Sequence, residues 1–124
     1  MARLGSLDYV MFFAPDVQVL TAFYRDVLEA TPIEEAYPHW ARLRLANIDL
    51  GIHAGGASDG GRGGQPAFRV QDLATLRAHL EAHGVPCEAY AAIPGAVKMD
   101  FRDPAGNVLQ ALQWGADLDT LGAR

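Results

Sequence analysis

His53 is the side chain of this sequence best suited to acid–base chemistry. It follows the segment 48–52, in which apolar residues alternate with Asp49 and Gly51. In a strand, this alternation places Asp49, Gly51 and His53 on the face opposite the apolar residues. His53 could therefore act as a general base or bind a metal ion, with Asp49 beside it. The alternative is a half-exposed histidine at a strand end without a chemical role.

Two amides and an arginine are candidates for ligand contact. Gln110 lies within the apolar run 108–112, directly after a turn-forming segment, Asp-Pro-Ala-Gly-Asn, at 103–107, and Gln65 opens another apolar segment. An amide inside an apolar strand needs a hydrogen-bond partner, so the two glutamines either contact a ligand or bond each other or water. Arg69 shares a strand face with Gln65, where it could bind an anionic ligand or form a salt bridge at the sheet edge.

Aromatic residues form a further candidate group. Tyr9, Met11 and Phe13 alternate along one strand face, and Trp40 opens another alternating segment. Such a set could line a cleft for a flat organic molecule. The alternative is that these side chains belong to the hydrophobic core.

Hydrophobic periodicity predicts the elements that position these residues. Apolar residues three and four positions apart predict helices over 17–30, capped by Asp16, and over 73–83, capped by Asp72 and with Leu73, Leu76 and Leu80 as its apolar stripe. Strands are predicted over 7–14, 33–36, 40–45, 48–53, 65–70, 85–90, 96–101 and 108–113. Each half of the chain therefore reads strand, helix, strand, strand, strand.

The two halves form an internal repeat of about 55 residues. Asp16 opens the motif Asp-Val-x-x-Leu and Asp72 opens Asp-Leu-x-x-Leu, while Pro32 and Pro86 each precede a glutamate by two positions. We predict a single domain over 1–124 with two modules, a glycine-rich linker and a tail. Module one spans 7–53, the linker 54–64, module two 65–113 and the tail 114–124.

Composition excludes several functional classes. The chain has 124 residues and a net charge of −5, and it lacks the basic stripe that nucleic-acid binding requires. No apolar run approaches the roughly 18 residues of a membrane span. Cys87 is the only cysteine, so an internal disulfide is impossible, which favours a reducing compartment. We expect a cytoplasmic protein that binds neither nucleic acid nor membrane.

The sequence resembles the vicinal oxygen chelate superfamily, which includes glyoxalase I, bleomycin-resistance proteins and extradiol dioxygenases. The matching motifs are Phe-Tyr-Arg-Asp-Val-Leu at 23–28, Val-x-Asp-Leu at 70–73 and Asp-Pro-x-Gly-Asn at 103–107. The resemblance implies an α+β fold in which two βαβββ modules form a cleft between curved mixed sheets. It also implies a homodimer, because members often pair modules between chains. It does not imply one reaction, because the superfamily includes several chemistries and some pure binders.

The resemblance also indicates where a metal ion would be held. In metal-using members, inward side chains surround one divalent cation, and the corresponding positions here are Tyr9, Gly51, Gln65 and Gln110. Gly51 has no side chain, and a phenol and two amides lack the imidazole, carboxylate or thiolate that zinc, iron and nickel prefer. A resident metal ion is therefore disfavoured, and no other cofactor is expected.

This donor set leads to a functional prediction with two alternatives. We expect a small-molecule-binding protein of the bleomycin-resistance-like type, without the usual metal centre. The first alternative is an enzyme, a glyoxalase-like lyase or isomerase or a dioxygenase, with a rearranged site built on His53, Gln65 and Gln110. The second alternative is a non-catalytic dimeric scaffold whose cleft is vestigial.

Overall fold

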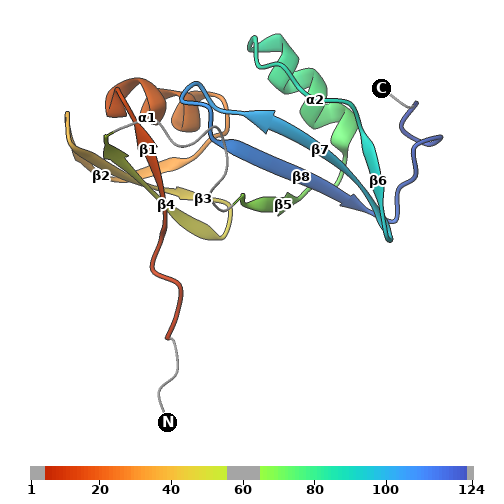
Figure 1. Cartoon of the computed structure of the whole chain (residues 1–124), viewed down its shortest axis with the longest axis horizontal. Coiled ribbons are helices and arrows are strands. Elements are labelled where there is room, and N and C mark those ends of the chain that lie inside the picture. The colour runs from red at the N-terminus through yellow and green to blue at the C-terminus, as the bar shows by residue number, and fades with distance from the viewer. Residues whose placement is uncertain (1–4, 56–64, 123–124) are drawn as a thin grey trace. The chain divides into compact units, whose positions relative to one another are not determined.

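The computed structural model describes residues 5–55 and 65–122, and the chain divides after residue 58 into two compact units (Figure 1). We call these units module one and module two. Each contains one helix and one four-stranded mixed sheet, in the order strand, helix, strand, strand, strand. The predicted α+β fold with two βαβββ modules is therefore confirmed, while the cleft between the two sheets stays a prediction.

Module one is built from a sheet with a helix on one face. Helix α1 begins after Asp16, whose carboxylate accepts a hydrogen bond from the backbone N–H of Val19 at 3.1 Å, as a helix cap does. It ends earlier than predicted, because Val27 is the C-cap and Glu29 adopts a positive φ of 59°. The strand order is β1-β4-β3-β2, with only β1 and β4 parallel. The elements are β1 (Val10–Ala14), α1 (Val17–Asp26), β2 (Thr31–Ala36), β3 (Trp40–Leu45) and β4 (Ile48–Ala54).

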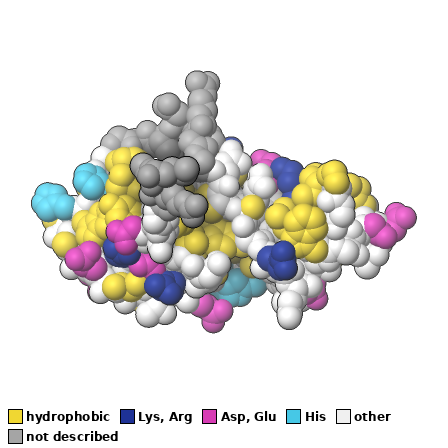
Figure 2. Space-filling view, turned by 90° about the horizontal axis from the view of Figure 1, so that it is seen from below, with side chains coloured by type: hydrophobic (Ala, Val, Ile, Leu, Met, Phe, Trp, Pro, Cys, Tyr) yellow, Lys and Arg dark blue, Asp and Glu magenta, His cyan; other side chains and the backbone are white. Residues whose placement is uncertain are grey.

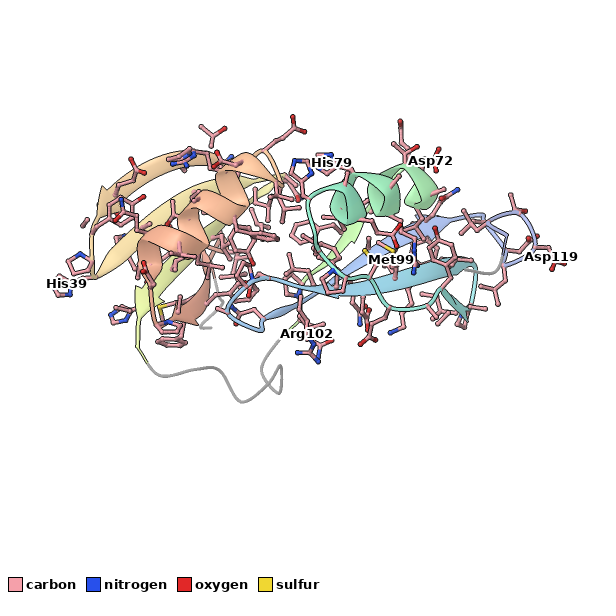
Figure 3. The ribbon with its side chains drawn as sticks, turned by 90° about the horizontal axis from the view of Figure 1, so that it is seen from above. His39, Asp72, His79, Met99, Arg102 and Asp119 are labelled. Atoms are coloured by element: carbon pink, nitrogen blue, oxygen red, sulfur yellow. The ribbon has the colours of Figure 1, made fainter. Side chains whose placement is uncertain are left out.

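Module two repeats this arrangement. Asp72 caps helix α2 by accepting a hydrogen bond from the backbone N–H of Thr75 at 3.2 Å. Met99 on the sheet is fully buried, and its side chain lies on the side of α2, with Sδ 3.7 Å from Nη1 of Arg77 (Figure 3). The strand order is β5-β8-β7-β6, with only β5 and β8 parallel. The elements are β5 (Ala67–Arg69), α2 (Leu73–Ala82), β6 (Ala91–Ile93), β7 (Ala96–Arg102) and β8 (Val108–Trp114).

The prediction of a strand over 85–90 is wrong. Within this segment only Cys87 makes a strand-like bridge, to Phe101. The guanidinium of Arg77 on α2 donates hydrogen bonds to the carbonyls of Cys87 at 3.3 Å and Glu88 at 2.9 Å, so neither oxygen serves a regular ladder. Arg77 is buried on the helix face where Leu76 was expected, and Leu76 is only partly covered. The edge strand of the sheet forms later, as β6.

The turn over 103–107 holds β8 in register with β7. Asp103 is buried, and its carboxylate accepts hydrogen bonds from the backbone N–H groups of Ala105 and Asn107 and from the Asn107 side chain, each at 2.9 Å. Gly106 has a φ of 90°, which a residue without a Cβ adopts at little cost. The resulting register places Gln110 opposite Asp100.

Each sheet has one face under its helix and one open face. In module one, Leu43, Leu50 and Ile52 face α1 and are completely buried. Neither helix within the described residues is long and apolar enough to cross a membrane. The open face of module one, opposite α1, is formed by Met11, Phe13, Trp40, Arg42, Arg44, Asp49, Gly51 and His53.

Candidate functional site

The open face of module one brings together several residues that the sequence singled out. Trp40 and His53 are cross-strand neighbours on β3 and β4, and Met11 on β1 lies beside Gly51 on β4. Tyr9 immediately precedes β1, and its ring meets the Trp40 ring edge-on, with the centroids 5.4 Å apart. The pairing of β1, β3 and β4 therefore brings these side chains to one face.

Gly51 is buried beneath two aromatic rings. A Cβ atom at this position would lie 2.5 Å from Cη2 of Trp40 and 3.1 Å from Cδ1 of Tyr9. The indole is held in place because its N–H donates a hydrogen bond to Oε1 of Glu34 at 2.7 Å. Since real Cβ atoms do not approach other atoms so closely, any side chain at position 51 would displace the Trp40 ring. We call Tyr9, Phe13, Trp40 and His53 the aromatic cluster.

His53 contributes a polar atom to the aromatic cluster. Its ring meets those of Phe13 and Trp40 edge-on, with centroid distances of 5.8 and 6.3 Å. Its Nδ1 lies within hydrogen-bonding distance of the carbonyl oxygen of Ala54. A carbonyl only accepts, so Nδ1 carries the proton, and Nε2 of the neutral ring is an acceptor. His53 can thus accept a hydrogen bond from a ligand or take a proton from one.

Asp49 forms ion pairs with two arginines and does not orient His53. Its carboxylate binds the guanidinium of Arg42 at 2.8 Å and that of Arg44, which lies directly opposite it on β3. Arg42 also binds the Asp8 carboxylate at 3.1 Å, and its guanidinium lies 5.1 Å from the centroid of the Tyr9 ring. The considered role of Asp49 beside His53 therefore gives way to an ion-pair cluster that supports Tyr9 from one side.

The Asp49 cluster makes the stability of the protein acid-sensitive. Hydrogen bonds from Arg44 and Arg42 lower the pKa of Asp49 below its ordinary value of 3.8, against the opposing effect of desolvation. The folded state binds this proton more weakly than the unfolded state, so the stabilisation is complete above the ordinary pKa and is lost as the pH falls through the lowered one. Wild-type protein should therefore lose unfolding free energy more steeply than Asp49→Asn between about pH 4 and pH 2.

Urea unfolding at a series of pH values measures this difference. Asp119→Asn, in the exposed C-terminal tail, is the matched control and should follow the wild type. Equal pH dependence of wild type and Asp49→Asn would contradict the role assigned to the cluster.

The candidate residues of module two lie on the open face of its own sheet, opposite α2. Nε2 of Gln110 lies 3.4 Å from Oε1 of Gln65, so the two amides bond each other. Arg69 is exposed and lies two residues beyond Ala67, the parallel partner of Gln110. The salt bridge considered for Arg69 is not formed with any carboxylate in the part of the chain that the structure describes.

The described residues do not fit a resident divalent metal ion of the kind the resemblance implies. The Gly51 position is covered by the Trp40 ring, and Gln65 and Gln110 supply only neutral oxygens. Among residues 5–55 and 65–122 no group of three or more histidine, cysteine or acidic side chains is close enough to hold a metal ion. Such ions prefer imidazole, thiolate or carboxylate ligands, so this donor set is unsuited to them.

The comparison with known families decides the membership of the chain. The family model of the Glyoxalase/Bleomycin resistance protein/Dioxygenase superfamily matches residues 6–111. The chain belongs to this superfamily. A comparison with curated proteins finds no match. The superfamily includes more than one activity, so membership establishes the scaffold and leaves the reaction or ligand open.

Solved structures share the superfamily fold with this chain. Lactoylglutathione lyase from Agrobacterium tumefaciens is 21% identical, with a TM-score of 0.72 and coverage of 93% of this chain and 100% of that one. A superfamily domain from Frankia sp. EAN1pec is 21% identical, with a TM-score of 0.71 and coverage of 90% and 99%. A fosfomycin resistance protein variant from Listeria monocytogenes, complexed with Mn(II), is 16% identical, with a TM-score of 0.76 and coverage of 94% of each chain. At these identities the likeness shows the fold alone.

The sequence analysis did not predict two features of these sites. Gly51 was considered as a missing ligand, whereas the structure makes it the floor beneath Trp40. A glycine inside a strand commonly marks the close approach of another group, so this signal was present. The hydrogen bond between Glu34 and Trp40 had no such signal, because it joins β2 to the first residue of β3 through side chains alone.

Proposed function

We propose that this protein is a small-molecule-binding member of the superfamily, of the bleomycin-resistance-like type, and that it works without a resident metal ion. The observation that carries the proposal is the burial of Gly51 beneath Trp40 and Tyr9. The position that the family resemblance assigns to a metal ligand here supports an aromatic surface instead. An aromatic surface in place of a metal ligand favours binding of a small molecule over metal-dependent catalysis.

The aromatic cluster supplies what a flat organic ligand needs. Tyr9 and Phe13 are each 37% exposed, so part of each ring is available for contact. Figure 2 shows hydrophobic side chains at the surface among acidic, basic and histidine side chains. Rings stack or meet edge-on with favourable energy, and Nε2 of His53 offers one acceptor that orients a donor on the ligand. Arg42 forms ion pairs with Asp49 and Asp8, so we assign it no contact with the ligand.

Gly51→Ala tests the aromatic cluster directly. The added Cβ should push the Trp40 ring out of place and weaken binding of beta-naphthol, a flat probe with one donor, by about tenfold or more, at a stability cost of about 1–3 kcal/mol. Proton–nitrogen correlation spectra report the indole N–H of Trp40 separately from that of Trp114. The probe should shift the Trp40 signal in wild type, while the Trp114 signal stays as an internal reference.

Gly5→Ala is the matched control, because a Cβ at Gly5 meets nothing within 4 Å. It should bind beta-naphthol as the wild type does. A Gly51→Ala variant with unchanged affinity and an unchanged Trp40 signal would show that the ring arrangement does not form the binding surface.

Metal analysis tests the other half of the proposal. Protein purified without chelator should contain no stoichiometric zinc, nickel, manganese or iron, and the affinity for beta-naphthol should be the same in EDTA and in added manganese chloride. Near-stoichiometric metal whose removal abolishes binding would overturn the metal-free function and favour the enzyme with a rearranged site. The homodimer and the cytoplasmic location stay predictions, and light scattering of the purified chain tests the first.

A further inference from the structure

Two histidines lie side by side on the exposed face of α2, in module two. His79 and His83 are four residues apart, a spacing that brings side chains to one face of a helix. Their ring centroids are 4.6 Å apart, and the ring planes are inclined by 48°. Both residues are exposed, and Figure 3 shows His79 toward the end of α2 opposite to Asp72. We call His79 and His83 the histidine pair.

A backbone hydrogen bond determines which nitrogen of His83 carries the proton. Nδ1 of His83 lies 2.9 Å from the carbonyl oxygen of His79. Because a carbonyl only accepts, Nδ1 of the neutral ring is protonated and the lone pair is on Nε2. Metal-binding histidines commonly have this arrangement, in which one ring nitrogen donates to a carbonyl and the other binds the ion. The His79 ring also has two nitrogens, so one can bind an ion while the other keeps a hydrogen bond.

The position of the histidine pair at the end of α2 favours a cation. His83 is the C-cap of the helix, where the last carbonyl groups form the negative end of the helix dipole. The helix Leu73–Ala82 contains one arginine, Arg77, whose buried side chain is paired with Glu81 at 3.3 Å. The charge of Arg77 is therefore balanced on the helix itself.

We propose that the histidine pair binds one exchangeable divalent transition-metal ion, of the nickel or copper kind. Imidazole nitrogen is a preferred ligand of these ions, whereas magnesium and calcium prefer oxygen. Two protein ligands leave the other coordination positions to water, so the ion exchanges readily and is removed when the protein is purified in metal-free buffer. The histidine pair belongs to α2, so this proposal does not rest on the aromatic cluster of module one or on its function.

Titration calorimetry of the full-length chain, without a histidine tag, tests the proposal with nickel chloride at about pH 7.5, where imidazole is largely neutral. One saturable site per chain should appear, and copper chloride should bind more tightly than nickel chloride, as it does to nitrogen ligands in general. Magnesium chloride should not bind. No saturable nickel site, or equal binding of magnesium, would overturn the proposal.

Hydrogen exchange of the α2 backbone amides gives a second measurement. The ion joins two residues one turn apart only while the helix is formed, so saturating nickel chloride should slow exchange at the end of α2. Unchanged exchange at saturation would show that the ion is bound elsewhere and would overturn the proposal.

Substitutions at exposed positions assign the ion to the histidine pair. His79→Gln and His83→Gln should each weaken nickel binding by at least about tenfold, because even the loss of a group that only supports a ligand costs this much. His39→Gln is the matched control, since His39 is an exposed histidine between β2 and β3, and it should bind nickel as the wild type does. A His83→Gln variant with wild-type affinity, or an equal loss in His39→Gln, would overturn the assignment.

A double variant separates the spacing of the histidines from their number. His79→Gln with Ala78→His keeps two histidines on α2 but places them five residues apart, on helix faces about 140° from each other. Ala78 is exposed, so the exchange leaves the buried face of α2 intact. The double variant should bind nickel as weakly as His79→Gln does. Wild-type affinity in the double variant would overturn the proposal that one ion joins both rings.

Discussion

Replacing Asp103 by alanine is expected to lower the free energy of unfolding by about 3 kcal/mol, because three hydrogen-bond donors lose one shared acceptor. The donors are the backbone N–H groups of Ala105 and Asn107 and the side-chain amide of Asn107, each 2.9 Å from the carboxylate. Asp103 and Asn107 are both buried, so water cannot replace the lost bonds. The turn also fixes the start of β8, so its loss should disturb the position of Gln110.

Urea denaturation measures the effect, and two variants calibrate it. Asp103→Asn preserves an oxygen for the backbone donors and should lose about half as much stability. Asp16→Ala removes the helix cap, whose carboxylate accepts one hydrogen bond, from the Val19 N–H at 3.1 Å, and should cost about 1 kcal/mol. An Asp103→Ala variant that loses no more than Asp16→Ala would contradict the central role of the turn.

Arg77→Met is expected to lower the free energy of unfolding by a similar amount, about 3 kcal/mol. Arg77 has a side chain only 9% exposed, and its guanidinium lies 5.0 Å from the centroid of the Tyr90 ring. Methionine preserves most of the apolar packing but leaves the carbonyls of Cys87 and Glu88 without their donor. The segment 85–90 should therefore loosen, which hydrogen exchange of its backbone amides would detect.

Arg25→Met is the control for Arg77→Met. Arg25 forms an exposed ion pair with Asp26, and exposed pairs contribute little, so its replacement should leave the free energy of unfolding close to that of the wild type. Thermal unfolding of the two variants gives the comparison. Equal stability of the two variants would show that the buried guanidinium does not hold the segment.

Local signals in the sequence were sufficient to predict most of the fold. Asp16 and Asp72 mark the helix starts, and the 103–107 segment specifies its own turn, since each acts on neighbours within a few residues. The segment 85–90 was mispredicted because its carbonyls bond Arg77 on another element, which no local pattern reveals. Buried arginines are rare, so the sequence favoured Leu76 at the helix face.

In the candidate site, too, local patterns predicted some features, and others depend on the tertiary structure. Strand alternation placed Asp49 and His53 on one face of their strand, because side-chain direction in a strand has a fixed period, and the pairing of β3 with β4 adds Trp40 to that face. The partners of these side chains depend on which strands are adjacent and in what register. Asp49 therefore meets Arg44 across β3 rather than His53 on its own strand.

The contact between Gly51 and Trp40 also restricts the order in which substitutions can accumulate at these positions. The Cβ of a histidine or glutamate at position 51 overlaps the indole unless the Trp40 ring moves, so such a residue is accommodated more readily in a chain whose residue 40 is smaller. The effect of a mutation at one position thus depends on the residue at the other, which is epistasis. A side chain at position 51 is therefore more costly in a chain with tryptophan at position 40 than in one with a smaller residue there.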